Sequence, residues 1–250
     1  MDNSEKLLLS KADDLFLQCQ RQARAKFSAF LDGGEQAIIE DNFAFPYGVN
    51  TMLYGGYENA ERRILGAFPE WEDANKDEFP ISVLKISSKF MSRLSHRDIL
   101  GALMSQGVDR SKTGDILIDD ENAYIFVCRD IAPYFTNNIT KIGNQGVKIT
   151  VCNTADITLP EPKTERMSVV AASCRIDAVT AALCGISRSA AAKLISSALV
   201  KVNHREVTNP SRAVQANDLI SVRGHGRFVF VSLDGETAKG RAHITAKKFI

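Results

Sequence analysis

Residues 174–203 read CRIDAVTAALCGISRSAAAKLISSALVKVN, and this stretch decides the fold of the last third of the chain. Apolar residues recur at helical spacing in two blocks, Ile176, Val179 and Leu183, then Ala191, Leu194, Ile195 and Ala198. Ser187 or Ser189 can cap the second helix. Strands are predicted at 200–202, 219–222 and 228–231, with a turn at Asn203–His204 and a short pairing at Val207. The pattern predicts an αα hairpin packed on a small sheet.

The same region is basic. Residues 163–250 hold 14 Lys and Arg against six Asp and Glu, a net charge of +8, whereas residues 1–162 hold 17 against 24, a net charge of −7. A basic module on a more acidic body is typical of nucleic-acid binding. The alternative is a solvated surface on which the charges cluster by chance.

The middle of the chain alternates strands and helices. Strands are predicted at 81–87, 116–118, 123–128 and 147–152, and helices at 95–106 and 131–139. This β-α-β-β-α-β order is ferredoxin-like, an architecture that also hosts RNA-recognition domains. Tyr124 and Phe126 share one face of a strand, where such domains stack bases, but core packing is the favoured interpretation.

The N-terminal third predicts one long helix over 4–30, ended by Asp32-Gly33-Gly34, and then strands at 49–54 and 62–68. An acidic, turn-rich stretch at 70–80 and a Pro-containing linker at 154–164 mark boundaries. We therefore predict an α+β, multi-domain chain. Its parts are an N-terminal α/β domain (1–75), a central ferredoxin-like (RRM-like) domain (76–155) and a C-terminal domain of two helices and a small sheet (165–250).

Several classes of protein are excluded. No run of 18 apolar residues occurs, and residues 1–10 do not form a secretory signal, so we expect a cytoplasmic protein without a membrane span. The five cysteines are widely spaced and are interpreted as free, mostly buried thiols. The four histidines lack metal-ligand spacing. His96-Arg97-Asp98 echoes a kinase loop but lies at a helix start, where Ser95 and Asp98 fit a capping role.

Five short blocks in the C-terminal third resemble the S4-type RNA-binding domain: 174–179, 185–189, 193–195, 199–203 and 217–228. Gly55-Gly-Tyr-Glu-Asn-Ala-Glu-Arg-Arg63, the run 96–110 and Gly114-Asp-Ile resemble the YlmH family. The resemblance implies a protein that binds large ribosomal subunits still carrying peptidyl-tRNA after a stall, in ribosome-associated quality control. This sequence departs from the S4 pattern at Ile176, at Ala178-Val179, and at His204 in place of the usual Gly.

The RNA-binding residues predicted from these blocks and from the charges are Arg175, Arg188, Ser189, Lys193, Lys201, Asn203, Arg205, Arg223 and Arg227. A helix N-terminus favours anions, so Arg188 with nearby backbone N–H groups suits a phosphate. Structural alternatives are a pairing of Arg175 with Asp177 or Asp218, and plain surface roles for Lys193 and Lys201. Asp177 and Asp218 are interpreted as ion-pair or turn residues.

No catalytic residue, metal ligand or phosphate-binding loop is predicted, and no cofactor. We expect a non-enzymatic protein whose partners are ribosomal RNA, tRNA and the large ribosomal subunit, with no membrane and no small-molecule substrate. Two alternatives stay open: an RNA-modifying enzyme of the pseudouridine-synthase kind, or a ribosome assembly factor.

Overall fold

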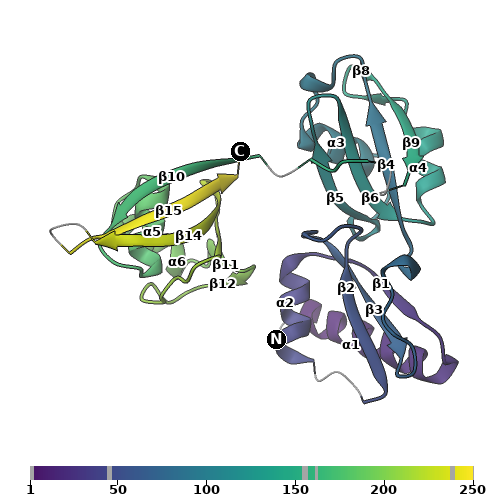
Figure 1. Cartoon of the computed structure of the whole chain (residues 1–250), viewed down its shortest axis with the longest axis horizontal. Helices are drawn as coiled ribbons and strands as arrows, with labels where there is room; N and C mark the ends of the chain where they lie inside the picture. Colours follow the sequence, from purple (N-terminus) through teal and green to yellow (C-terminus); the bar gives the residue numbers. More distant parts are fainter. Residues whose placement is uncertain (1–2, 44–46, 154–156, 161–162, 237–239, 250) are drawn as a thin grey trace. The chain divides into compact units, whose positions relative to one another are not determined.

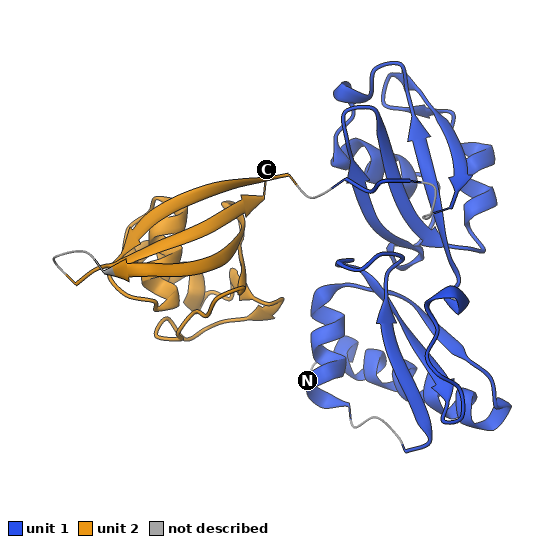
Figure 2. Cartoon of the chain, viewed as in Figure 1, with its two compact units in different colours: residues 1–161 blue, residues 162–250 orange. Residues whose placement is uncertain are grey.

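The computed structural model describes residues 3–43, 47–153, 157–160, 163–236 and 240–249. The chain divides into two compact units, residues 1–161 (unit 1) and 162–250 (unit 2), as Figure 2 shows. Unit 1 holds the two sheets predicted for the N-terminal and central domains. The predicted boundary between those domains, near residue 75, stays a prediction.

The first sheet of unit 1 is three-stranded and antiparallel, in the order β1-β3-β2 (Figure 1). Its elements are α1 (Asn3–Gln22), β1 (Lys26–Leu31), α2 (Gly33–Asn42), β2 (Val49–Tyr54) and β3 (Arg63–Pro69). Phe16 and Cys19 of α1 and Ile39 of α2 are buried against Leu65 and Ala67 of β3. The two helices therefore cover one face of this sheet.

The predicted helix over 4–30 is wrong beyond Gln22. Ala23 has a φ of 50°, which ends α1, and the chain continues as β1. Phe30 is 1% exposed and pairs with Ile64 of β3, so long-range strand pairing outweighs the local helical spacing. The predicted stop at Asp32 is instead the start of α2: Asp32 accepts the Glu35 N–H at 2.9 Å, and Glu35 accepts the Asp32 N–H at 2.7 Å.

The second sheet of unit 1 confirms the predicted ferredoxin-like order. Its elements are β4 (Ile81–Ser87), α3 (His96–Met104), β5 (Thr113–Ile118), β6 (Asn122–Cys128), α4 (Ala132–Asn138) and β9 (Lys148–Cys152). The strands run antiparallel in the order β5-β6-β4-β9. Ser95 and Asp98 cap α3 reciprocally, as the sequence predicts. Smaller elements complete the unit: η1 (Lys76–Glu78), η2 (Met91–Arg93), η3 (Arg110–Lys112), β7 (Lys141–Ile142) and β8 (Gln145–Gly146).

The two faces of this second sheet are both used. One face packs on α3 and α4. On the other, Phe126 is fully buried and Tyr124 is 5% exposed, in a cluster that includes Phe30, Phe68 and Phe79 from the N-terminal part and its connection. The prediction that Tyr124 and Phe126 pack in a core is confirmed. Bases cannot stack on them in this structure.

Besides this shared cluster, the loop of residues 55–62 joins the two sheets through hydrogen bonds. The Asp115 carboxylate on β5 accepts the Tyr57 hydroxyl at 2.8 Å and the backbone N–H groups of Glu61 and Arg62 at 2.7 and 3.1 Å. The Tyr57 ring lies 4.9 Å from that of Phe126. Burial raises the pKa of Asp115, against the opposing effect of these three donors.

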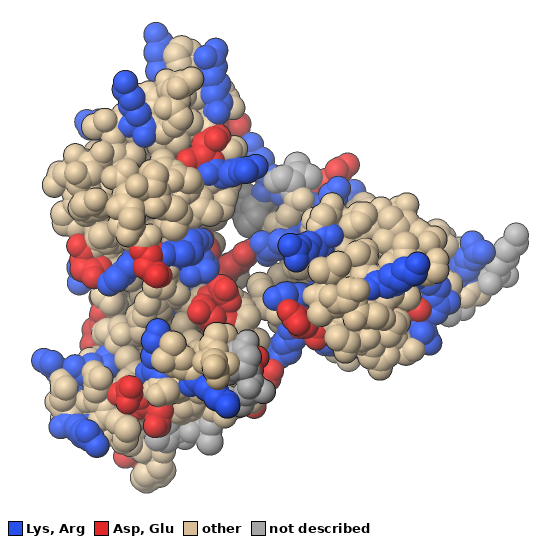
Figure 3. All heavy atoms as spheres, turned by 180° about the vertical axis from the view of Figure 1, so that it is seen from behind, with Lys and Arg blue, Asp and Glu red and all other residues tan. Residues whose placement is uncertain are grey.

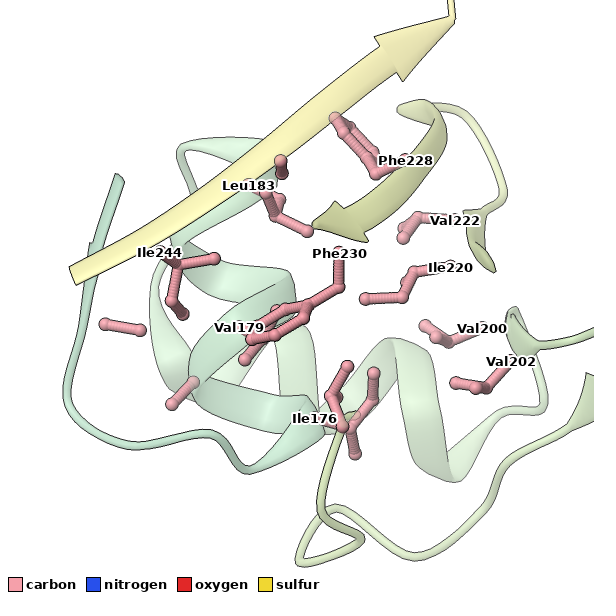
Figure 4. Packing of buried hydrophobic residues seen from close by; sticks show 14 of the residues in the cluster. Ile176, Val179, Leu183, Val200, Val202, Ile220, Val222, Phe228, Phe230 and Ile244 are labelled. Carbon is pink, nitrogen blue, oxygen red and sulfur yellow. The ribbon is translucent and has the colours of Figure 1, made fainter. Parts of the chain in front are cut away.

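Unit 2 is built on a six-stranded antiparallel sheet in the order β10-β15-β14-β13-β11-β12. Its elements are β10 (Thr164–Ala171), α5 (Ile176–Cys184), α6 (Arg188–Ser196), β11 (Val200–Val202), β12 (Arg205–Glu206), β13 (Leu219–Val222), β14 (Gly226–Glu236) and β15 (Ala242–Phe249). The α5–α6 hairpin packs on one face, and Figure 4 shows Phe230 between Val179 and Ile220.

Strands β10 and β15 were not predicted, and they make the sheet larger than expected. They pair antiparallel without interruption, from Thr164 opposite Phe249 to Ala171 opposite Ala242. Thr164, the last residue of the predicted linker, begins β10. Ile157 and Leu159 of that linker pack against the core of unit 1, and its residues 154–156 and 161–162 lie outside the described residues.

Gly56 provides a test of the packing of the loop 55–62 against Phe126 in unit 1. Its φ is 99°, and a Cβ atom there would lie 2.3 Å from Cδ1 of Phe126. We expect Gly56→Ala to lower the free energy of unfolding of unit 1 by about 2 kcal/mol or more. The measurement is hydrogen exchange of β5 and β6 amides in increasing urea.

Gly101→Ala is the matched control. Gly101 lies in α3, and a Cβ atom would meet nothing within 4 Å. Alanine should raise the free energy of unfolding there by about 0.5–1 kcal/mol, because glycine is the poorer helix former. Equal effects of the two substitutions would contradict the close approach of Gly56 to Phe126.

Candidate nucleic-acid interface

A buried carboxylate holds two of the predicted arginines at the starts of the two helices of unit 2. Asp177, whose side chain is 7% exposed, accepts Arg175 Nε and Nη2 at 3.2 Å each and Arg188 Nε at 2.9 Å. The Ala178 N–H donates to it at 2.8 Å. Arg175 and Arg188 keep 42% and 49% of their side chains exposed. We call these three residues the Arg–Asp–Arg cluster.

The electrostatics of this cluster favour a charged carboxylate. Burial alone raises the pKa of Asp177, but the hydrogen bonds from Arg175, Arg188 and the Ala178 N–H outweigh it and hold the pKa below its ordinary value. The carboxylate therefore stays ionised at neutral pH. The structural alternative in which Arg175 pairs with Asp177 is realised, and so is the interpretation of Asp177 as an ion-pair residue.

The ion pairs orient the two guanidinium groups without using all of their donors. Of the three Arg188 side-chain nitrogens, only Nε donates a hydrogen bond to another described residue. Both NH2 groups of this side chain therefore remain available. Arg175 likewise keeps its Nη1 group. Planar guanidinium groups held in place suit bidentate contacts with phosphate oxygens. Ser189 follows Arg188 in the first turn of α6, with its hydroxyl 3.0 Å from that of Ser187, which caps the helix.

The remaining predicted residues lie elsewhere on unit 2. Lys193 is exposed further along α6. Lys201 on β11 is paired with Glu206 of β12 at 3.7 Å. Arg205 lies on β12, and exposed Arg223 begins the turn between β13 and β14.

Asn203 has a structural role in the β11–β12 turn. Its amide donates to Asp218 at 2.7 Å and accepts the Leu219 N–H at 2.9 Å, so Asp218 is a turn residue, as predicted. Asn203 and His204 both have positive φ, 50° and 66°. This geometry explains why glycine is the usual residue at the position of His204.

Strand register divides the predicted residues between two faces of unit 2. Val200, Val222 and Phe228 point into the core under the helices. The residues between them alternate outward, so Lys201, Ser221 and Arg227 form one row on the face away from α5 and α6. The Arg227 guanidinium carbon lies 4.7 Å from the centre of the Phe249 ring. The predicted residues thus do not make one surface: the Arg–Asp–Arg cluster and this row lie on different layers.

Sequence reasoning missed two cations on that outer face. Arg166 of β10 pairs with Lys247 of β15, which in turn lies opposite Val229 of β14. Only recognition of β10 and β15 as paired strands could have found them. Figure 3 views unit 2 from the opposite side, behind the strands that lie in front in Figure 1, and Lys and Arg side chains are spread over that face too, with fewer Asp and Glu.

Other kinds of site receive no support from the described residues. Within them, no group of three or more His, Cys, Asp or Glu side chains could hold a metal ion. In that same part of the chain, no single helix is long and apolar enough to cross a membrane. Taken together, α5 and α6 reach the required length and apolar composition, but the pair is bent by 115°. The five cysteines are free, as predicted, but only Cys19 and Cys128 are buried and the other three are partly exposed, so the expectation of mostly buried thiols is wrong.

Comparisons with known proteins bear on both units. Residues 74–156 match the family described as "Putative RNA-binding domain in YlmH", and residues 174–220 match the S4 domain. The chain is 32% identical over 231 residues to the "Ribosome-associated protein quality control protein P2" of Bacillus subtilis (strain 168), covering 92% of this chain and 89% of that protein.

A solved structure shares the fold. The "Cell division protein ylmH from Streptococcus pneumoniae" is similar over 62% of this chain and 95% of its own, with a TM-score of 0.52 and 23% identity. The Bacillus subtilis protein is similar over most of both chains, so this likeness extends well beyond the two matched domains.

The Arg–Asp–Arg cluster predicts a pH-dependent contribution to stability. Asp177→Asn should lower the free energy of unfolding of unit 2 by about 1–3 kcal/mol at pH 7, because a neutral amide, which also carries its own N–H donors, replaces the charged acceptor of the two arginines. The pKa of Asp177 is lower in the folded protein than in the unfolded chain, where it is about 3.9. The stabilisation that the ionised carboxylate gives is therefore present above the unfolded pKa, and it is lost as the pH falls through the folded-state pKa. The difference between the variant and the natural chain should therefore shrink below about pH 4.

Urea unfolding, followed by hydrogen exchange of unit 2 from pH 3 to pH 7, measures this difference. Glu165→Gln removes an exposed carboxylate from the same unit and should change stability by less than about 0.5 kcal/mol. A difference for Asp177→Asn that does not change with pH would contradict the role given to the ionised carboxylate.

Proposed function

This chain belongs to the YlmH family, and we propose that it binds structured RNA on the large ribosomal subunit, with tRNA close by. It acts there in the cytoplasm, in the quality control of stalled peptidyl-tRNA complexes. The membership gives the coarser part of this function, a ribosome-associated RNA-binding protein. The subunit, the tRNA and the contact residues are the finer part and are our proposal.

The observation that carries the proposal is the Arg–Asp–Arg cluster. Arg175 and Arg188 lie at the starts of α5 and α6, fixed by one buried carboxylate and half exposed. Arginines held in advance lose less entropy when they bind, and their free N–H groups can each reach a phosphate oxygen. Lys193, on the same helix as Arg188, extends the positive surface.

The chemistry of such contacts determines what kind of specificity is possible. Phosphate contacts give affinity and register but carry no base sequence. We therefore propose that unit 2 recognises the shape of folded RNA, through its phosphates and 2′-hydroxyls. The row of Lys201 and Arg227 on the outer face gives a second, separate contact surface on the same unit.

The proposed function is not enzymatic. The matched domains and the curated relative are of RNA-binding and quality-control type. An RNA-modifying activity would appear as a mass change in RNA incubated with the protein. A ribosome assembly factor would bind empty large subunits as well as those that carry tRNA, whereas a quality-control factor should prefer the occupied ones.

Neutralising the two arginines tests the proposal. Arg175→Gln with Arg188→Gln should weaken binding to large ribosomal subunits by about 2–4 kcal/mol and lower the slope of log affinity against log salt by about one per lost phosphate contact. Glutamine is preferable to glutamate here, because a reversed charge would repel Asp177 and disturb the fold. Sedimentation with tRNA-occupied subunits at several KCl concentrations gives both quantities.

Lys6→Gln with Arg21→Gln is the matched control, because it removes the same charge from exposed positions on α1. The control should bind like the natural chain. If both double variants bound equally well, with unit 2 folded by hydrogen exchange, the cluster would not be the RNA contact.

A further inference from the structure

The central domain of unit 1 matches an RNA-binding family, yet the sheet face on which such folds stack bases is occupied. Phe126 and Tyr124 are buried against the N-terminal part of the same unit. Any RNA contact by this domain must therefore use another part of its surface.

Three segments meet at one end of that domain. Ser87, the last residue of β4, pairs with Lys148 at the start of β9. The next residue, Ser88, donates its hydroxyl to the carbonyl of Gly146 at 2.9 Å, and Gly146 pairs with Lys141 in the β7–β8 hairpin. We call the surface made by residues 88–93, Lys141 and Lys148 the basic tip.

Buried residues fix the shape of the basic tip. Met91 is 3% and Ile142 is 1% exposed, and both belong to the core beneath α3 and α4. Their neighbours Lys89, Phe90 and Arg93 consequently point outward. The tip is part of the folded domain, and its charged side chains are carried on anchored backbone.

The exposed side chains combine an aromatic ring with positive charge. Phe90 is 42% exposed, with the Arg93 guanidinium carbon 4.6 Å and the Lys89 amine 5.6 Å from the centre of its ring. Lys141 and Lys148 are exposed, and residues 88–94 and 139–150 contain no Asp or Glu. The acidic turn 119–121 lies at the same end of the sheet, next to the tip on the β6 side, because Ser87 pairs with Asn122 and donates its hydroxyl to that side chain at 3.0 Å. Figure 3 shows Lys and Arg side chains projecting at the end of unit 1 that carries β8 in Figure 1.

We propose that the basic tip is the RNA contact of the central domain, taking a single-stranded or looped segment. A base stacks at Phe90, and Lys89, Arg93, Lys141 and Lys148 take the flanking phosphates. Aromatic stacking beside a line of cations is the chemistry of such recognition and requires no base-specific hydrogen bond. This inference rests on the proposed function and adds an RNA contact on unit 1 to those proposed on unit 2.

The test uses the full chain and tRNA-occupied large ribosomal subunits. Lys89, Arg93, Lys141 and Lys148 are all replaced by Gln in one variant, and exposed Lys6, Lys11, Arg21 and Arg24 in its matched control. We expect the tip variant to bind about tenfold more weakly or worse, with its salt slope reduced by roughly 0.7–0.9 per contact. The control should bind as the natural chain does.

Two further measurements separate stacking from charge. Phe90→Ala should weaken binding about tenfold while Phe90→Trp keeps it, because a base stacks on either aromatic ring. Ultraviolet cross-linking followed by mass spectrometry should recover peptides containing Phe90 that carry a nucleotide.

The outcomes distinguish the two proposals. A tip variant equal to its control, while Arg175→Gln with Arg188→Gln loses binding, overturns the basic tip and leaves the proposed function standing. Cross-links from Phe90 to a ribosomal protein and not to RNA also overturn it. If the natural chain does not bind large subunits, both proposals fall together.

Discussion

The half-buried carboxylate of Asp115 is the interaction on which the architecture of unit 1 depends. It accepts one hydroxyl and two backbone N–H groups from the loop 55–62, and so fixes that loop against β5. Tyr57 and Gly56 then press on Phe126. The consequence is a shared aromatic core between two sheets, which removes the second sheet's open face from any role in stacking bases. Gly56, Tyr57 and Asp115, which lie in blocks that resemble the family, are therefore held by packing and hydrogen bonds within unit 1.

Unit 2 also has an aspartate carboxylate that accepts several hydrogen bonds, but this carboxylate has a different role. Asp177 is a nearly buried carboxylate surrounded by donors, but two of its partners are arginines that remain half exposed. An anion that is costly to bury is offset by cations whose other donors point outward. In unit 1 the carboxylate joins two layers of the fold; in unit 2 it sets the direction of functional groups. Of the proposed RNA contacts, the Arg–Asp–Arg cluster and the basic tip therefore lie at helix starts and loop ends, and the row of Lys201 and Arg227 lies on the sheet face that carries no helices.

The sequence predicts most of what local signals determine. Ser95 with Asp98, the strand at 81–87 and the stripe of Ile176, Val179 and Leu183 each follow from short-range patterns, and the structure contains all of them. Strand β15 was not predicted because its inward residues include Ala242 and Ala246, whose small side chains give a weak alternation of apolar and polar residues. The cations of the candidate site at Arg175, Arg188, Lys201 and Arg227 could be named from sequence, whereas Arg166 and Lys247 could not. The division of the site's cations between the helix side and the outer face could not be predicted either, since it depends on a register set by long-range pairing.

The pairing of β10 with β15 also has a mechanical consequence. Thr164, where unit 2 begins its sheet, lies directly opposite Phe249 near the end of the chain, and the two strands run antiparallel. Tension applied between these two ends pulls at one end of the ladder and breaks its hydrogen bonds in succession, as a zipper opens. Tension across opposite ends of the ladder would load all of those bonds at once. Unit 2 is thus weakest to a pull between these two strand ends, and a pull of this kind would separate β10 from β15 first.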